Sequence, residues 1–293
     1  MFTFPNFTNF SPISLSIALV LTIIIVFVWH EILSRARQKS LTFFFWLVFF
    51  IAMAFGFIWF LFFETFISEE LLNFFSTNFA YALFFSLIIT GAIIELSKNT
   101  IVRFFGKKFF ETIDDVVDLS FATALGFTAM ENIFHFYALF LHADTYDTPM
   151  IIIKEIISQV FFIIPIHLFC SGIFGYYYRL SLFAHPNQRK FWKKAYGFVQ
   201  FTKGTVISIT VYGLFFYIMT QDLKMGEVAN FFGFKNFPFN ESLFPFISFI
   251  FSSLTALYLF EKMGNADFIT ETKTEKTKRE EKELADLHEQ KGK

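Results

Sequence analysis

The chain has 293 residues, of which 55% are hydrophobic, and its formal net charge is −1. Its mean hydropathy of +0.54 indicates a polytopic membrane protein rather than a pair of soluble domains. The charge pattern shows no basic face for nucleic acid, and the single Cys170 excludes an intrachain disulfide. We therefore expect this chain to reside in the lipid bilayer, and we expect no nucleic-acid partner.

Seven apolar segments follow one another, each close to the roughly 20 residues that cross a bilayer as a helix. They lie at about residues 13–30, 41–63, 78–97, 117–141, 151–178, 197–220 and 243–260. Backbone inside lipid must satisfy its own hydrogen bonds, so unbroken apolar runs predict helices. The segment 64–75 is too polar to span and is expected at the interface. The sequence thus predicts an all-α membrane bundle of about seven transmembrane helices, forming a domain over residues 1–262.

Basic and acidic connections alternate between these segments and predict the orientation of the chain. Lys and Arg follow the first, third and fifth segments, as Arg35, Arg37, Lys39, Arg103, Lys107, Lys108, Arg179, Arg189, Lys190, Lys193 and Lys194. Acidic residues follow the second and fourth, as Glu64, Glu69, Glu70, Asp144 and Asp147. Because cytoplasmic loops are enriched in Lys and Arg, we expect the N-terminus outside and the C-terminus in the cytoplasm.

The two ends of the chain carry their own patterns. The first apolar segment has no basic residue on its N-terminal side, so we expect a retained anchor rather than a cleavable signal peptide. Residues 263–293 are rich in Lys, Glu and Thr and poor in apolar residues. This composition predicts a charged, flexible cytoplasmic tail.

Three ionisable residues, Glu95, Glu131 and His167, fall inside apolar segments on three different predicted helices. A charge at bilayer depth costs about +2.5 to +3.5 kcal/mol on insertion scales, so such residues face protein or water and mark functional sites. At 1.5 Å of rise per residue they lie about 12, 20 and 18 Å from the cytoplasmic ends of their helices. A shared interior site is therefore geometrically allowed.

Lys98 is three residues after Glu95, on the same helix face, and can form an ion pair with it. The structural interpretation, which we favour for Lys98, is that this local pair forms while the lysine side chain snorkels to the cytoplasmic headgroups. Glu95 lies deeper, and a cation nearby would offset its burial only in part. We therefore expect a functional role for Glu95 and a local pairing role for Lys98.

Polar residues form one stripe on the fourth predicted helix. Glu131 and His135 are four residues apart, and Asn132 is three before His135. The stripe must face protein or water, and Gly126 and Ala129 would let another helix approach closely. The structural alternative is a hydrogen-bond cluster that only fixes helix packing.

His167 follows Pro165, which can bend the helix, and precedes Gly172 and Gly175, which form a close-packing face. A membrane histidine of this kind can also be a hydrogen-bonded packing residue. Cys170 is expected to be an inert buried thiol, because the sequence specifies no basic group to activate it.

At these residues the chain resembles the PrsW family of polytopic membrane proteases, relatives of the CAAX-processing and APH-1-like membrane proteins. The family's paired-Glu motif, Glu-Glu-x-x-Lys, is matched from its second Glu onward, and motifs on two later helices are matched in order and spacing. The matching positions are Glu95, Lys98, Asp115, Leu125, Gly126, Phe127, Glu131, Asn132, Pro165, His167, Gly172 and Gly175. The resemblance covers about residues 78–180.

Two positions depart from the family pattern. The first Glu of the paired motif is Ile94, so the surviving Glu95 must act alone. The Tyr of the Glu-Asn-x-x-Tyr motif is His135 here. This histidine either supplies an extra metal ligand or reflects sequence drift in a protein that has lost catalysis.

The resemblance implies an intramembrane peptidase in the bacterial cytoplasmic (inner) membrane. Such an enzyme would hydrolyse a peptide bond in or near the transmembrane segment of a membrane protein, and the typical target in the family is an anti-sigma factor released in stress signalling. Glu95, Glu131 and His167 would be its catalytic residues, and Lys98, Asn132, His135 and Asp115 would support them.

Two mechanisms fit these side chains. In one, Glu131, His167 and His135 bind Zn²⁺, which activates a water, and Glu95 is the general base. In the other no metal takes part: Glu95 takes the proton from water, while His167 and Asn132 donate hydrogen bonds to the oxyanion.

Two other functions stay open. Ile94 and His135 also fit a catalytically degenerate family member that acts as a membrane binding or scaffold protein. Buried carboxylates would also serve a small proton-coupled transporter, although no paired broken helices accompany them here.

Overall fold

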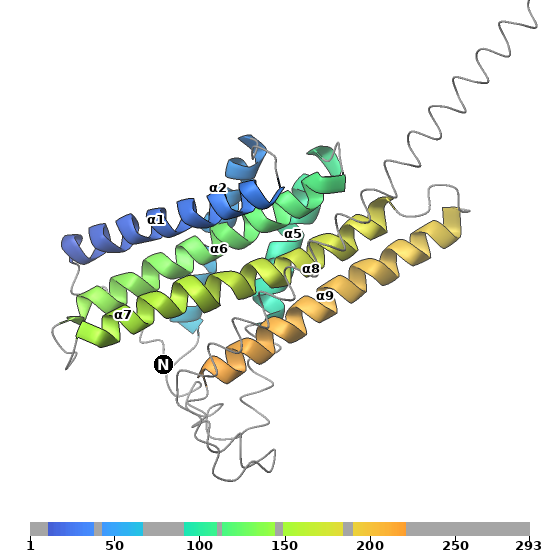
Figure 1. Cartoon of the computed structure of the whole chain (residues 1–293). Helices are drawn as coiled ribbons and strands as arrows, with labels where there is room; N and C mark the ends of the chain where they lie inside the picture. The colour runs from blue at the N-terminus through green and yellow to red at the C-terminus, as the bar shows by residue number, and fades with distance from the viewer. Residues whose placement is uncertain are drawn as a thin grey trace, which may run out of the picture. The chain divides into compact units, whose positions relative to one another are not determined.

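The computed structural model describes residues 11–37, 43–66, 91–109, 113–143, 149–183 and 190–220, and the secondary structure of these ranges is helical (Figure 1). The elements are α1 (Pro12–Arg37), α2 (Phe43–Phe66), α5 (Ile93–Phe109), α6 (Ile113–Leu141), α7 (Pro149–Ser158), the π-helical turn η4 (Gln159–Ile163), α8 (Ile164–Phe183) and α9 (Lys190–Thr220). All belong to one compact unit, Met1–Ser253. The all-α prediction is confirmed for the residues described.

Four stretches in these ranges are long and apolar enough to cross a membrane. They are Pro12–Ser34, Phe43–Leu61, Asp115–Leu141 and Glu155–Leu182. They correspond to the first, second, fourth and fifth predicted segments, and the sixth is helical as part of α9. The count of seven and the orientation of the termini stay predictions. The predicted span 243–260, the tail 263–293 and most of 64–75 lie outside the described residues.

Several helices extend further than the hydrophobicity pattern predicted. The third predicted segment ends at 97, whereas α5 continues to Phe109, and α9 begins at Lys190 rather than at 197. Basic residues assigned to connections therefore lie on helices, namely Arg35, Arg37, Arg103, Lys107, Lys108, Arg179, Lys190, Lys193 and Lys194. Hydrophobicity reports where a helix leaves the hydrocarbon, and the backbone hydrogen bonding continues until a stop signal ends it.

The predicted segment 151–178 is not one regular helix. The π turn η4 separates α7 from α8 just before Pro165. A proline ring collides with the carbonyl four residues earlier in a regular α-helix, and that carbonyl belongs to Phe161, inside the π turn. The wider turn accommodates the proline, and the predicted effect of Pro165 on its helix therefore takes the form of a π turn.

Helix α6 contacts α1, α2, α5 and α8, and α8 also packs along α9 (Figure 1). Glycines set how closely these helices approach. A Cβ at Gly126 of α6 would lie 2.8 Å from the Cβ of Ala52 on α2, and one at Gly175 of α8 would lie 2.7 Å from Oγ of Ser120 on α6. The close-packing role predicted for Gly126 and Gly175 is confirmed, and it brings polar groups on neighbouring helices within reach of one another.

The α2–α6 contact should tolerate no added methyl group at its tightest point. We expect Gly126→Ala to lower the free energy of unfolding by about 1–3 kcal/mol, because the new methyl group meets backbone and Ala52. Gly56→Ala lies at the same interface but its Cβ has 3.2 Å to Met130, so its effect should be smaller. Thermal unfolding of both variants in detergent measures the difference, and equal losses would contradict this account.

Candidate active site

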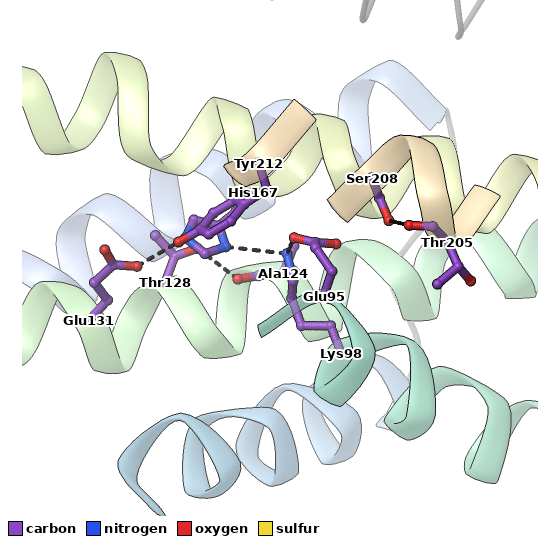
Figure 2. A network of polar contacts seen from close by, with 9 residues as sticks. All are labelled: Glu95, Lys98, Ala124, Thr128, Glu131, His167, Thr205, Ser208 and Tyr212. Atoms are coloured by element: carbon purple, nitrogen blue, oxygen red, sulfur yellow. Dashed lines mark hydrogen bonds and ion pairs between the residues drawn. The ribbon is translucent and has the colours of Figure 1, made fainter. Parts of the chain in front are cut away.

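Four ionisable side chains form one line of polar contacts between three helices (Figure 2). Lys98 Nζ lies 2.5 Å from Glu95 Oε1, and both residues come from α5. The same Nζ lies 3.3 Å from Nδ1 of His167 on α8, and Nε2 of that ring lies 2.9 Å from Oε2 of Glu131 on α6. The structure thus brings together the three residues that the sequence placed on three separate helices.

Most of this line is closed off from the surroundings. Glu95, Lys98 and His167 are at most 1% exposed, whereas the Glu131 side chain is 13% exposed. Charges buried to this degree are tolerated only when they are paired and hydrogen-bonded. Glu131 is therefore the least buried end of the line.

Lys98 does not snorkel. Its ammonium group turns inward and joins Glu95 to His167, so the predicted local ion pair is present but the predicted snorkelling is wrong. The spacing of three residues places Glu95 and Lys98 on one face of α5, and α6, α8 and α9 all pack against this helix. Inward pairing places the Lys98 ammonium beside the Glu95 carboxylate, so both buried charges are paired. A snorkelling lysine would leave the buried carboxylate without a counter-charge.

The contacts of His167 determine where its proton lies. A lysine ammonium is donor-only, so it donates to Nδ1 and that nitrogen must be unprotonated. The neutral ring then carries its proton on Nε2 and donates it to the Glu131 carboxylate. One side chain, Lys98, thereby orients the histidine that holds the accessible carboxylate.

Sequence analysis missed a fifth member of the site, Tyr212 on α9. Its hydroxyl oxygen lies 3.2 Å from Nε2 of His167, and the two ring centroids are 4.8 Å apart. A tyrosine is ordinary in an apolar helix, so residue type alone gave no signal. Thr205, Ser208 and Tyr212 are nevertheless spaced by three and four residues and are all buried, and such a polar stripe could have been found.

The residues expected to support catalysis, Asn132, His135 and Asp115, do not lie together. Asn132 is fully buried beside Glu131 in sequence, and its amide makes no hydrogen bond within the part of the chain described. His135 pairs with Glu155 on α7, with Nε2 3.3 Å from Oε2. Asp115 is sixteen residues before Glu131, about 24 Å along the same helix, and is not part of this line. Cys170 is a buried free thiol, as expected.

The described residues do not fit a zinc site with three protein ligands. No three His, Cys, Asp or Glu side chains among them are gathered for a metal ion. Both nitrogens of His167 have protein partners, and the Lys98 ammonium lies 3.3 Å from one of them. A cation at this point would repel a divalent metal held by the same ring.

Residues 37–258, about three quarters of the chain, match the model of the PrsW family intramembrane metalloprotease. The chain belongs to the PrsW family. The match extends past the motifs to include α9 and Tyr212, and together with the apolar helices it identifies an integral membrane protein of a protease family. The comparisons with curated proteins and with solved structures give no match.

The ion pair makes a prediction about stability. Lys98→Met should lower the free energy of unfolding by about 3–5 kcal/mol, because it leaves Glu95 buried without its counter-charge. Adding Glu95→Gln to Lys98→Met should recover part of that loss. Unfolding of the purified protein in detergent measures both, with Lys203→Met as the matched control at an exposed lysine of α9. A double variant no more stable than Lys98→Met would count against a buried charge pair.

Proposed function

We propose that this PrsW family member hydrolyses a peptide bond in or near the transmembrane segment of another membrane protein, with Glu131 and His167 at the reacting centre. The observation that supports this best is the Glu131–His167 hydrogen bond of 2.9 Å, held within the helix bundle by the buried Lys98. A carboxylate oriented in this way at a partly exposed position can activate water where lipid otherwise excludes it.

Glu131 is the general base in this proposal. It is the most exposed carboxylate of the line, and His167 holds one of its two oxygens, so the other can accept a proton from water. The resulting hydroxide adds to the carbonyl carbon of the substrate. When the carbon–nitrogen bond breaks, the proton passes from Glu131 to the leaving amine, which balances the reaction.

Glu95 takes a different role from the one that the sequence suggested. Its carboxylate is completely buried and pairs with Lys98, so it is poorly placed to meet water. We assign it to neutralising Lys98, which in turn orients His167. One carboxylate balances one ammonium group, so the apolar Ile94, itself buried at the position of the family's first Glu, leaves the pair intact.

The oxyanion needs a hydrogen-bond donor close to the base. The amide of Asn132 follows Glu131 directly on α6 and is fully buried without a hydrogen-bond partner among the described residues. A buried amide left in this state costs free energy unless something binds it. We assign Asn132 to the developing oxyanion, where a donor of this kind stabilises the transition state by several kcal/mol. Because this amide is as buried as Glu95, the assignment requires that substrate binding opens the helix packing around it.

The catalytic roles can be tested without knowing the substrate. Glu131→Gln and His167→Ala should each reduce proteolysis by about 100-fold or more, because they remove the base and the group that orients it. Membrane-protein fragments in cells that express each variant are compared by mass spectrometry with those in wild-type cells. Glu155→Gln is the matched control, since this carboxylate pairs with His135 outside the line. Fragments that persist in the Glu131→Gln and His167→Ala cells would contradict the proposal.

A metal requirement is tested separately. Because Lys98 and Glu131 already bind both ring nitrogens of His167, we expect fragment formation by the purified enzyme in proteoliposomes to survive dialysis against EDTA. Activity that is lost on chelation and restored by Zn²⁺ would show that residues outside the described part complete a metal site. No step of the mechanism above passes through a metal.

A scaffold function is the second candidate, and Ile94 favours it because this buried apolar residue replaces a family carboxylate. A scaffold predicts that cells expressing Glu131→Gln keep the wild-type phenotype while the protein is present at normal abundance. A peptidase predicts that they resemble cells without the protein. The phenotype of this single variant separates the two functions.

A further inference from the structure

Tyr212 contacts the two residues in the middle of the line, His167 and Lys98. Its hydroxyl lies 3.2 Å from Nε2 of His167, and its ring centroid lies 5.4 Å from Nζ of Lys98 (Figure 2). The residue is 3% exposed. Tyr212 comes from α9, whereas the motif residues lie on α5, α6 and α8. Helix α9 is therefore a fourth helix that contributes to the surroundings of the imidazole.

Close packing places this tyrosine. A Cβ at Gly91, which precedes α5, would lie 3.0 Å from the Cα of Gly213, the neighbour of Tyr212. A Cβ at Gly204 of α9 would lie 2.7 Å from the Cβ of Tyr177 on α8. Close packing at Gly204 and at Gly213, before and after Tyr212 on α9, therefore fixes the distance of the tyrosine from both α5 and α8.

We propose that Tyr212 is a positioning residue whose ring holds the Lys98 ammonium and the His167 imidazole in the arrangement in which Lys98 donates to Nδ1 and Nε2 keeps the proton. In this tautomer the Nε2–H group can donate to the tyrosine oxygen as well as to Glu131. The face of the aromatic ring also attracts the Lys98 ammonium, which must remain a donor to Nδ1. The hydroxyl could also donate to an unprotonated Nε2, so the contact that selects this arrangement is the one between the ring and the Lys98 ammonium.

The ring of Tyr212 also opposes a flip of the imidazole. A half-turn about the Cβ–Cγ bond would exchange each nitrogen for a carbon and break the contacts to Lys98 and Glu131 together. The tyrosine ring, 4.8 Å from the imidazole between centroids, occupies part of the space through which that turn would pass. The catalytic consequence of this restraint rests on the proposed function, whereas the restraint itself does not.

Nitrogen NMR of the full-length protein in detergent, labelled at its six histidines, measures the tautomer directly. The signals of His167 are assigned by their loss in His167→Ala. At neutral pH we expect one neutral form with Nε2 protonated in the wild type and in Tyr212→Phe, which keeps the ring beside Lys98. Tyr212→Leu removes the ring and should give a mixture of tautomers with broader His167 signals.

The matched control is Tyr178→Phe, at a tyrosine that is equally buried but stacks on Phe174, away from the imidazole. It should leave the His167 signals unchanged, and the other five histidines report that each variant is folded. Unchanged His167 signals in Tyr212→Leu would overturn the proposal.

Activity provides a second readout that separates this inference from the proposed function. Tyr212→Phe should slow fragment formation by about 3- to 10-fold, the effect of one neutral hydrogen bond. Wild-type rates in Tyr212→Leu, with none in His167→Ala, would refute the tyrosine's role and keep the peptidase. A mixture of tautomers in Tyr212→Leu, together with fragment formation retained in His167→Ala, would support the tyrosine's role and refute the peptidase.

Discussion

The site depends on one buried ammonium group. Lys98 can be removed from water only because Glu95 lies within one helical turn, and the resulting pair leaves the lysine able to donate to His167. That donation places the histidine's proton on the nitrogen that faces Glu131. The orientation of the accessible carboxylate is therefore set two residues away, by a charge that never meets solvent.

Such contacts need helices that approach more closely than bulky side chains allow. Gly126 brings α2 against α6, Gly175 brings α8 against α6, and Gly91 brings α9 against the start of α5. The apolar residues around these contacts exclude water, which strengthens each polar interaction inside. Packing and electrostatics in this bundle are thus parts of one arrangement, since a shift of α9 would move Tyr212 away from both Lys98 and His167.

The chain belongs to the PrsW family of intramembrane metalloproteases. The departures from the family motifs fall where the cluster can absorb them. Ile94 leaves a single carboxylate for a single ammonium, and His135 pairs with Glu155 of α7. The line from Glu95 to Glu131 is complete without either family side chain.

The sequence by itself determined the helical class, the three polar residues inside apolar runs and the glycines that let helices meet, because insertion cost and residue size are local properties. The sequence did not predict the helix ends, because α5 and α9 keep their backbone hydrogen bonds beyond the hydrophobic run. Only the tertiary structure decided that Lys98 turns inward, that His135 joins Glu155, and that Tyr212 reaches the imidazole. Each of those outcomes depends on which side chain a neighbouring helix presents, and spacing along one helix contains no such information.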